Sequence, residues 1–292
     1  LQAMRKKLIS GRVLYTDSTH LKASANKNKF KKKQVVKATR SYLAELEESI
    51  TADRKTHGKK PLKAREEKPE TREVKSSPVD PDSGYMVRDG KPKGFFYLDH
   101  RTTCGKHNLI TDTHVTAANI HDSIPYLERL DRQRQRFDFE TEAVGLDAGY
   151  MSAPICKGLE DRAIYGVIGY RRPTHIKGRF YKREYIYDPK EDGYRCPNDQ
   201  LLTYRTTNRD GYREYRSDPK ICQHCPLLGQ CTSNAQYIKT VTRHVWEEYR
   251  EKVDSHRKSK AGKALYKRRK ETIERSFADA KQLHGHRYIR MR

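Results

Sequence analysis

Residues 11–26 read GRVLYTDSTHLKASAN and begin with a short run that favours a β-strand. Val13, Leu14 and Tyr15 follow a glycine, and side chains of these types pack well on the pleated surface of a sheet. The run ends at Asp17. We therefore expect a strand whose final carboxylate points out from the edge of a sheet.

A second stretch, AVGLDAGY at residues 143–150, repeats this pattern. Residues 143–146 are apolar or glycine and predict a compact strand, and Asp147 follows it. The next two residues, Ala148 and Gly149, let the backbone turn away from the carboxylate. Two strand-end aspartates of one sheet would lie at the same edge, although a turn or capping role is the commoner use of a single aspartate.

A third acidic residue lies in a predicted helix near the C-terminus, in ETIERSFADAK at residues 271–281. Glu274 and Lys281 fall on one helical face, with two packing residues between them. Clustered carboxylates repel one another unless hard divalent cations neutralise them. Two such ions about 3.5–4 Å apart could activate an attacking hydroxyl and stabilise the leaving oxygen of a phosphodiester. The alternative is solvent-facing charge on a helix rich in Lys and Arg.

Strands and helices alternate over much of the chain, which predicts an α/β core with a sheet flanked by helices. The predicted helices cover residues 39–52, 121–136 and 152–162, and helical composition returns from 242 to 281. The predicted strands, besides those that end at the two aspartates, cover residues 95–98, 109–115 and 164–170.

The expected organisation has three parts. Residues 11–170 form the first part of the α/β core, within which 53–94 is a mobile basic connection rich in Lys, Glu, Pro and Ser. Residues 171–241 break the pattern and form a Cys-rich insertion, and residues 242–292 supply the C-terminal helical part of the core. Only 16 residues precede Asp17, so we expect any further domain that the protein needs to lie outside this sequence.

The composition favours a polyanionic partner. Lys and Arg together number 62 against 38 Asp and Glu, which gives a formal net charge of +24. A surplus of this size attracts nucleic acid, with a merely soluble basic protein as the alternative. No run approaches the roughly 18 apolar residues that a membrane-spanning helix needs, and no signal peptide is present. We expect a cytoplasmic protein.

Four of the six cysteines fall in the insertion. Cys222 and Cys225 form a C-x-x-C pair, Cys231 follows and Cys196 lies upstream. Four thiolates could hold a structural zinc ion, with His224 as an alternative ligand. The other interpretation is a packing role without metal. The two cysteines outside the set, Cys104 and Cys156, are expected to be small buried hydrophobic residues.

Several blocks together resemble the bacterial insertion-sequence transposases of the DDE class. They are GRVLYTDSTHLKASAN, AVGLDAGYMSAPICKGLEDRAIYGVIGYRRP, TRHVWEE and RRKETIERSFADAKQLHGHRY. The stretch PVDPDSGYMVRDGKPKGFFYLDH is similar to the same branch, in which a Cys-containing insert separates the second Asp from the Glu. The resemblance runs from about Gly11 to Arg290.

The resemblance implies an RNase H-like fold, with a mixed sheet flanked by helices and a Cys-rich insertion subdomain. In that fold the first and fourth core strands carry the aspartates and a late helix carries the glutamate. By position these are Asp17, Asp147 and Glu274, which would be both the catalytic residues and the ligands of two Mg²⁺ ions, with Mn²⁺ as a substitute.

The family also has a signature of Tyr, Arg, the catalytic Glu, and a Lys after six intervening residues. Lys281 matches that last spacing, whereas four residues rather than three separate Arg269 from Glu274. Lys270 therefore stands at the arginine position. The DNA-contacting residues expected from this signature are Lys281, Arg269 and Lys270.

The implied activity is metal-dependent hydrolysis at the ends of an insertion sequence, followed by strand transfer. The expected partners are double-stranded DNA, both transposon ends and target, and a second copy of the chain when assembled on DNA. Two alternatives remain open: a non-catalytic basic nucleic-acid-binding protein, and an RNase H-like nuclease without strand transfer. The charge and the cysteines suit a binding protein, but the three spaced carboxylates do not.

Overall fold

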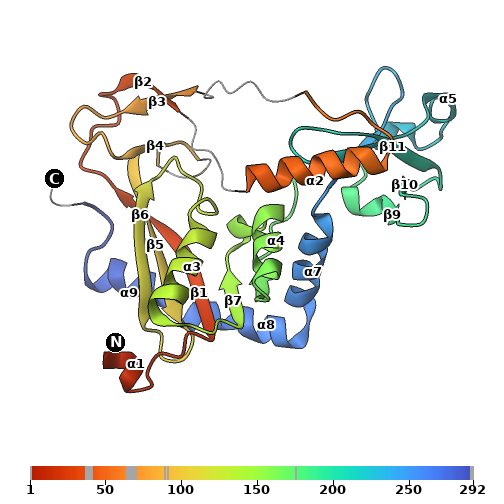
Figure 1. Cartoon of the computed structure of the whole chain (residues 1–292). Helices are drawn as coiled ribbons and strands as arrows, with labels where there is room; N and C mark the ends of the chain where they lie inside the picture. Colours follow the sequence, from red (N-terminus) through yellow and green to blue (C-terminus); the bar gives the residue numbers. More distant parts are fainter. Residues whose placement is uncertain are drawn as a thin grey trace. The chain divides into compact units, whose positions relative to one another are not determined.

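The computed structural model describes residues 2–36, 42–63, 71–88, 90, 92–174 and 176–289. The chain divides into two compact units. The first unit consists of Leu1–Ala38, Glu67–Arg171 and Tyr249–Arg292, and the second of Thr39–Glu66 and Arg172–Glu248. Each unit has its own sheet (Figure 1). Each also has its own hydrophobic core.

The first unit is built on a six-stranded mixed sheet with the order β4-β5-β1-β7-β8, and β6 also pairs with β5. The central strand β1 runs antiparallel to β5 and parallel to β7, and β7 runs parallel to β8. The strands are β1 Val13–Lys22, β4 Gly84–Met86, β5 Gly94–Cys104, β6 Ile110–Ala117, β7 Ala143–Leu146 and β8 Tyr165–Ile168.

Helices cover both faces of this sheet because side chains alternate along each strand. Leu14 points into the larger core, which helices α3 (Tyr126–Phe137) and α4 (Ala153–Asp161) cover. Its neighbour Tyr15 packs with Ile273 and Phe277 of α9 on the other side. The remaining helices of this part are α1 Gln2–Arg5, α7 Glu247–Lys258, α8 Lys260–Lys267 and α9 Ile273–Leu283, with the 3₁₀ turns η1 Ala148–Tyr150 and η3 Arg268–Glu271.

A separate two-stranded ribbon also belongs to the first unit. It consists of β2 (Lys31–Val36) paired antiparallel with β3 (Thr71–Ser76). Both β3 and β4 fall inside the 53–94 stretch that the sequence predicts to be a mobile basic connection. Residues 64–70, 89 and 91 of that stretch lie outside the described residues.

The second unit has a five-stranded antiparallel sheet in the order β13-β12-β11-β10-β9. Its small core is largely aromatic, with Tyr185, Tyr194 and Tyr215 packed around Leu202 and Val241. The elements are α2 Leu43–Thr56, η2 Lys182–Glu184, β9 Ile186–Asp188, β10 Gly193–Arg195, β11 Leu201–Thr207, β12 Tyr212–Arg216, α5 Pro219–Cys222, α6 Leu228–Cys231 and β13 Thr240–His244.

The units divide the chain differently from the boundaries expected from the sequence. Helix α2, predicted for residues 39–52 within the core, groups with the second unit, while residues 39–41 lie outside the described residues. Its buried Asp53 accepts a hydrogen bond from Arg213 Nε of β12 at 2.6 Å, so a polar tie attaches the helix to that sheet.

The helix predicted from residue 242 is also wrong at its start. Residues Thr240–His244 form strand β13, and the helix begins only at Glu247. Pairing along the whole of β12 supplies hydrogen bonds that outweigh the helical composition of this stretch. The mixed α/β architecture, with a mixed sheet and flanking helices, is confirmed. Among the described residues, none of the helices is long and apolar enough to cross a membrane.

Candidate active site

The first two carboxylates are brought together by strand register. Thr16 of β1 pairs with Leu146 of β7 as the last parallel pair, and Asp17 and Asp147 directly follow these two residues. Strand β1 itself continues to Lys22, because its pairing with β5 extends that far, so Asp17 does not end its strand as predicted. Asp17 lies instead beside the end of β7, the parallel neighbour of β1 in the sheet.

Asp147 caps the turn that follows β7. Its Oδ1 accepts a hydrogen bond from the backbone N–H of Ala148 at 2.6 Å, and about half of its side chain (51%) is exposed. Asp17 is much less accessible, with 20% of its side chain exposed, and it accepts a hydrogen bond from the backbone N–H of Ser18. Asp17 is therefore the more buried of the two aspartates, whereas Asp147 is half-exposed to solvent.

Glu274 enters the site from the first turn of α9. The helix is anchored because Ile273 and Phe277, on either side of Glu274 along the chain, are buried against Tyr15 of β1. The Glu274 side chain is 44% exposed. Packing of the neighbouring apolar residues thus fixes the position of a carboxylate that is itself partly open to solvent.

All three carboxylates lie around one guanidinium group. Arg269, on η3, donates a hydrogen bond from Nη2 to Asp17 Oδ2 at 2.6 Å. Its Nη1 lies 3.6 Å from Glu274 Oε1 and 4.0 Å from Asp147 Oδ1. Only 4% of the Arg269 side chain is exposed. The structure therefore gathers the predicted triad, with a buried positive charge at its centre that the sequence did not predict.

Burial dominates the electrostatics of this cluster. It raises the pKa of Asp17 to about 6, against the lowering effect of Arg269 and of the Ser18 N–H. The pKa of Arg269 is raised despite its own burial, because the carboxylates of Asp17, Asp147 and Glu274 favour the charged form. One guanidinium among three carboxylates leaves a local excess of negative charge.

A fourth carboxylate, Asp122, belongs to the surroundings of Asp17. Its charge helps to raise the pKa of Asp17 and that of the buried Tyr150. Its Oδ1 atom is buried and has no hydrogen-bond partner among the described residues. Asp122 lies within the stretch 121–136 that the sequence predicts to be helical, but α3 begins only after Pro125. No local pattern distinguishes Asp122 from an ordinary turn aspartate.

The oxygen-rich cluster suits a hard cation by its chemistry. The donors are carboxylates, and their negative charge exceeds what Arg269 supplies. As arranged around the guanidinium, however, they do not form a ligand set: among the described residues no group of three or more His, Cys, Asp or Glu side chains is placed to hold a metal ion. Metal binding would require the carboxylates to rearrange around Arg269.

The other residues expected to contact DNA lie in different environments. Lys270, next to Arg269 on η3, is exposed, and Lys281, two turns after Glu274 on α9, is half-buried. Arg269 is buried and directs its charge to the carboxylates. Of the three, only Lys270 is fully on the surface.

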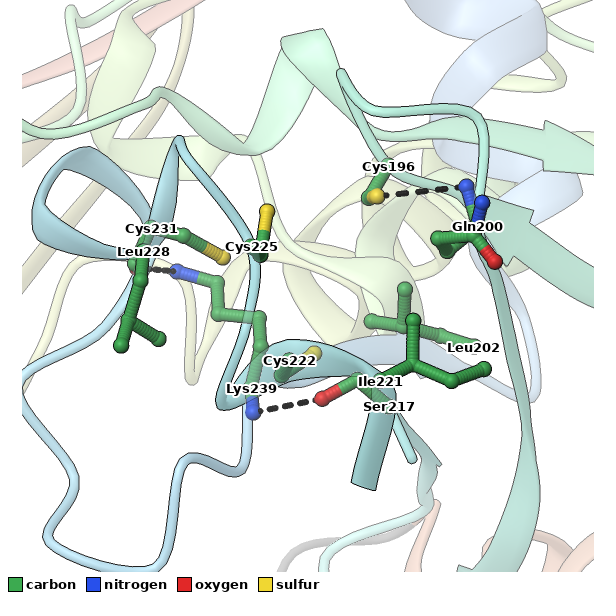
Figure 2. Close-up of a pocket in the computed structure, with 10 residues that line it drawn as sticks. All are labelled: Cys196, Gln200, Leu202, Ser217, Ile221, Cys222, Cys225, Leu228, Cys231 and Lys239. Atoms are coloured by element: carbon green, nitrogen blue, oxygen red, sulfur yellow. Dashed lines mark hydrogen bonds between the residues drawn. The ribbon is translucent and has the colours of Figure 1, made fainter. Parts of the chain in front are cut away.

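The four cysteines of the second unit line one cavity, which Figure 2 shows. They are Cys196, Cys222, Cys225 and Cys231, all with free thiols and partial exposure. His224, the alternative ligand, is exposed and does not line this cavity. The other two cysteines, Cys104 and Cys156, are buried in the core of the first unit, as predicted.

Comparison with known proteins gives one match. The family described as the transposase DDE domain matches residues 195–292, about a third of the chain. The matched part includes Arg269, Glu274 and the four cysteines that line the cavity, and it excludes Asp17 and Asp147. No curated protein and no solved structure matches. The match confirms the resemblance to transposases of the DDE class.

Proposed function

We propose that this chain is a DDE-class transposase, which catalyses phosphodiester hydrolysis at the ends of an insertion sequence and then joins the freed 3′ end to target DNA. The match of residues 195–292 to the transposase DDE domain supports this proposal. Asp17, Asp147 and Glu274 are the catalytic carboxylates. The observation that carries the proposal is their convergence on Arg269, although two of the three lie outside the matched segment.

The architecture supports an RNase H-like core. The strands lie in the order β6-β5-β1-β7-β8 along the sheet, with three antiparallel strands followed by two parallel ones. The first strand of the core carries Asp17, the fourth leads directly into Asp147, and a late helix supplies Glu274. This is the placement that the resemblance implies for the three acids.

Two Mg²⁺ ions, with Mn²⁺ as a substitute, would be held by the three carboxylates. When bound, such ions supply charge stabilisation at the attacking and leaving oxygens of a phosphodiester. The protein's own contribution is the fixed placement of the acids. Arg269 opposes the rise that burial causes in the pKa of Asp17, and the three carboxylates still carry more negative charge than this one guanidinium offsets.

Double-stranded DNA, as transposon end and as target, is the proposed substrate. The net charge of +24 favours it, and strand β2 exposes three consecutive lysines, Lys31 to Lys33. Near the carboxylates, Lys270 and Lys281 would contact phosphates, which orients the strand without reading its sequence. We propose assembly as a homodimer on DNA, because two ends must be joined, and a location in the bacterial cytoplasm with the nucleoid.

The test is nicking of supercoiled plasmid in Mg²⁺ or Mn²⁺, a readout that needs no knowledge of the terminal sequence. We expect Asp147→Asn to reduce nicking by at least a hundredfold. The matched control is Asp279→Asn, the same change at a carboxylate on α9 that is 52% exposed and outside the cluster. Equal nicking by wild type and Asp147→Asn would refute the site assignment.

A second assay separates the transposase from its nearest rival. Protein that nicks is incubated with target plasmid and labelled DNA that ends in a free 3′-hydroxyl. Joining of the label to the plasmid supports strand transfer. Nicking without joining, over the same range of metal and protein concentrations, would assign an RNase H-like nuclease instead.

A further inference from the structure

The long connection between β12 and β13 lacks the usual means of holding its shape. All of residues 218–239 are described, and none of them is buried. The two short helices in this segment, α5 and α6, also bury no residue. Cys231 packs against the aromatic core only as a partly buried side chain. A connection of this length with so little buried surface needs another constraint if it is to keep one conformation.

The cysteines occupy the positions where such a constraint would act. Cys196 follows β10 in the hairpin to β11, and Cys222 and Cys231 end α5 and α6. Cys225 lies in the tight turn between those helices, where its N–H donates to the Cys222 carbonyl. Three separate turns therefore meet at one cavity of about 20 Å³, the size of a single water-sized occupant.

Neighbouring groups are placed to support thiolates. The backbone N–H of Gln200 donates to Cys196 Sγ at 3.4 Å. Tyr185 Oη lies 3.1 Å from Cys231 Sγ, where it can donate to a thiolate. Lys239 also lines the cavity, and its Nζ donates to the Cys231 carbonyl at 3.0 Å (Figure 2). Donors and a positive charge of this kind orient sulfur ligands and offset their charge.

We propose that the second unit contains a structural zinc site whose ligands are Cys196, Cys222, Cys225 and Cys231. Zn²⁺ replaces the four thiol protons, which pass to solvent, and four thiolates complete a tetrahedral shell. The ion joins the connection to the β10–β11 hairpin. This assignment does not depend on DNA cleavage.

The sulfurs do not yet form a closed coordination group, since no metal-binding cluster is present among the described residues. Zinc must therefore draw them together, by rotation about the Cys side-chain bonds and small shifts of the connection. No residue of 218–239 is fully buried, so small shifts of that segment would disrupt little of the core. The remaining arrangements of the four free thiols are one or two disulfides, which need an oxidant, or no bond at all.

The test measures metal in the full chain, expressed with added zinc and purified without a metal-binding tag. We expect one zinc ion per chain. Exchange for Co²⁺ should give the thiolate-to-metal charge-transfer absorption and the intense visible bands of a tetrahedral sulfur site. Cys222→Ser and Cys225→Ser should each lower the retained zinc at least tenfold. Cys156→Ala, which removes a thiol from the other unit, and His224→Ala should keep it.

A measurement on the unmodified chain covers the case in which the variants fail to fold. Four thiols should resist a thiol reagent until a chelator is added, and then react. Folded wild-type protein with no zinc and no cobalt spectrum would overturn the proposal. Retention of zinc by both serine variants, or disulfides among the four cysteines in peptide maps, would overturn it equally.

Discussion

Replacement of Asp17 by Asn should make the metal-free protein more stable at neutral pH. The folded state raises the pKa of Asp17 from 3.8 to about 6, chiefly by burial, so it holds this proton more tightly than the unfolded chain does. Part of the wild-type free energy of unfolding is therefore lost as pH rises from about 4 to about 6, and this loss persists at higher pH. Asn keeps the shape of the neutral side chain and carries no charge.

The size of the effect follows from the pKa. A change from 3.8 to about 6 corresponds to about 3 kcal/mol, at about 1.4 kcal/mol for each pH unit. For a folding unit of this size, that is a rise in Tm of about 6–12 °C for Asp17→Asn at pH 7.5. At pH 4 both proteins carry a neutral group and should melt together. Loss of the pairing with Arg269 is already contained in this figure, because that pairing helps to set the pKa.

The assay is thermal unfolding in chelator from pH 4 to pH 8, followed by circular dichroism. Asp279→Asn is the control, since its exposed carboxylate should leave the pH dependence unchanged. Added Mg²⁺ should raise the Tm of wild type and not that of Asp17→Asn. An Asp17→Asn protein that is less stable than wild type at pH 7.5, or a pH dependence identical to wild type, would refute the reasoning.

Three further predictions concern the same cluster and use the same unfolding series. Arg269→Leu removes the ion pair with Asp17 at 2.6 Å, which should lower the free energy of unfolding by about 1.5–3 kcal/mol at pH 7.5. It should also extend the pH-dependent loss of stability to higher pH. The control Arg275→Leu, at a 69% exposed arginine, should change little. Asp122→Asn should lower the pKa of Asp17 and so shrink the loss between pH 4 and pH 6, and an unchanged profile would contradict the proximity of the two carboxylates. Phe277→Ala should cost about 3–5 kcal/mol and detach α9, with nicking lost in parallel, while Leu283→Ala at a 73% exposed position should stay within about 0.5 kcal/mol.

Local patterns predicted the elements that bury one clear face. Strand β7, helix α4 and helix α9 lie close to their expected positions because apolar side chains recur in them at the matching period. Local patterns predicted the wrong element where pairing with a segment distant in the sequence decides the conformation. Thr240–His244 forms a strand because β12 lies beside it, and α2 joins the second unit through the buried Asp53, a residue that reads as polar surface.

The same distinction, between local patterns and distant pairing, separates what the sequence could and could not predict about the site. Asp17 and Asp147 could be singled out from the sequence because each follows a strand-forming run, but their proximity depends on the register of β1 against β7. That register fixes which side chains meet, and no local pattern contains it.

Arg269 is the sharper example, because four consecutive basic residues, Lys267 to Lys270, look equivalent in the sequence. The rotation of η3 against β1 decides which of them turns inward, and it buries Arg269 while leaving its two neighbours exposed. The buried guanidinium then changes what the three carboxylates need in order to lie close together. With Arg269 among them, the triad holds together without metal, and a divalent ion must compete with a guanidinium already paired to Asp17. Affinity for the ion and stability of the metal-free fold are therefore linked through a residue whose role only the tertiary structure assigns.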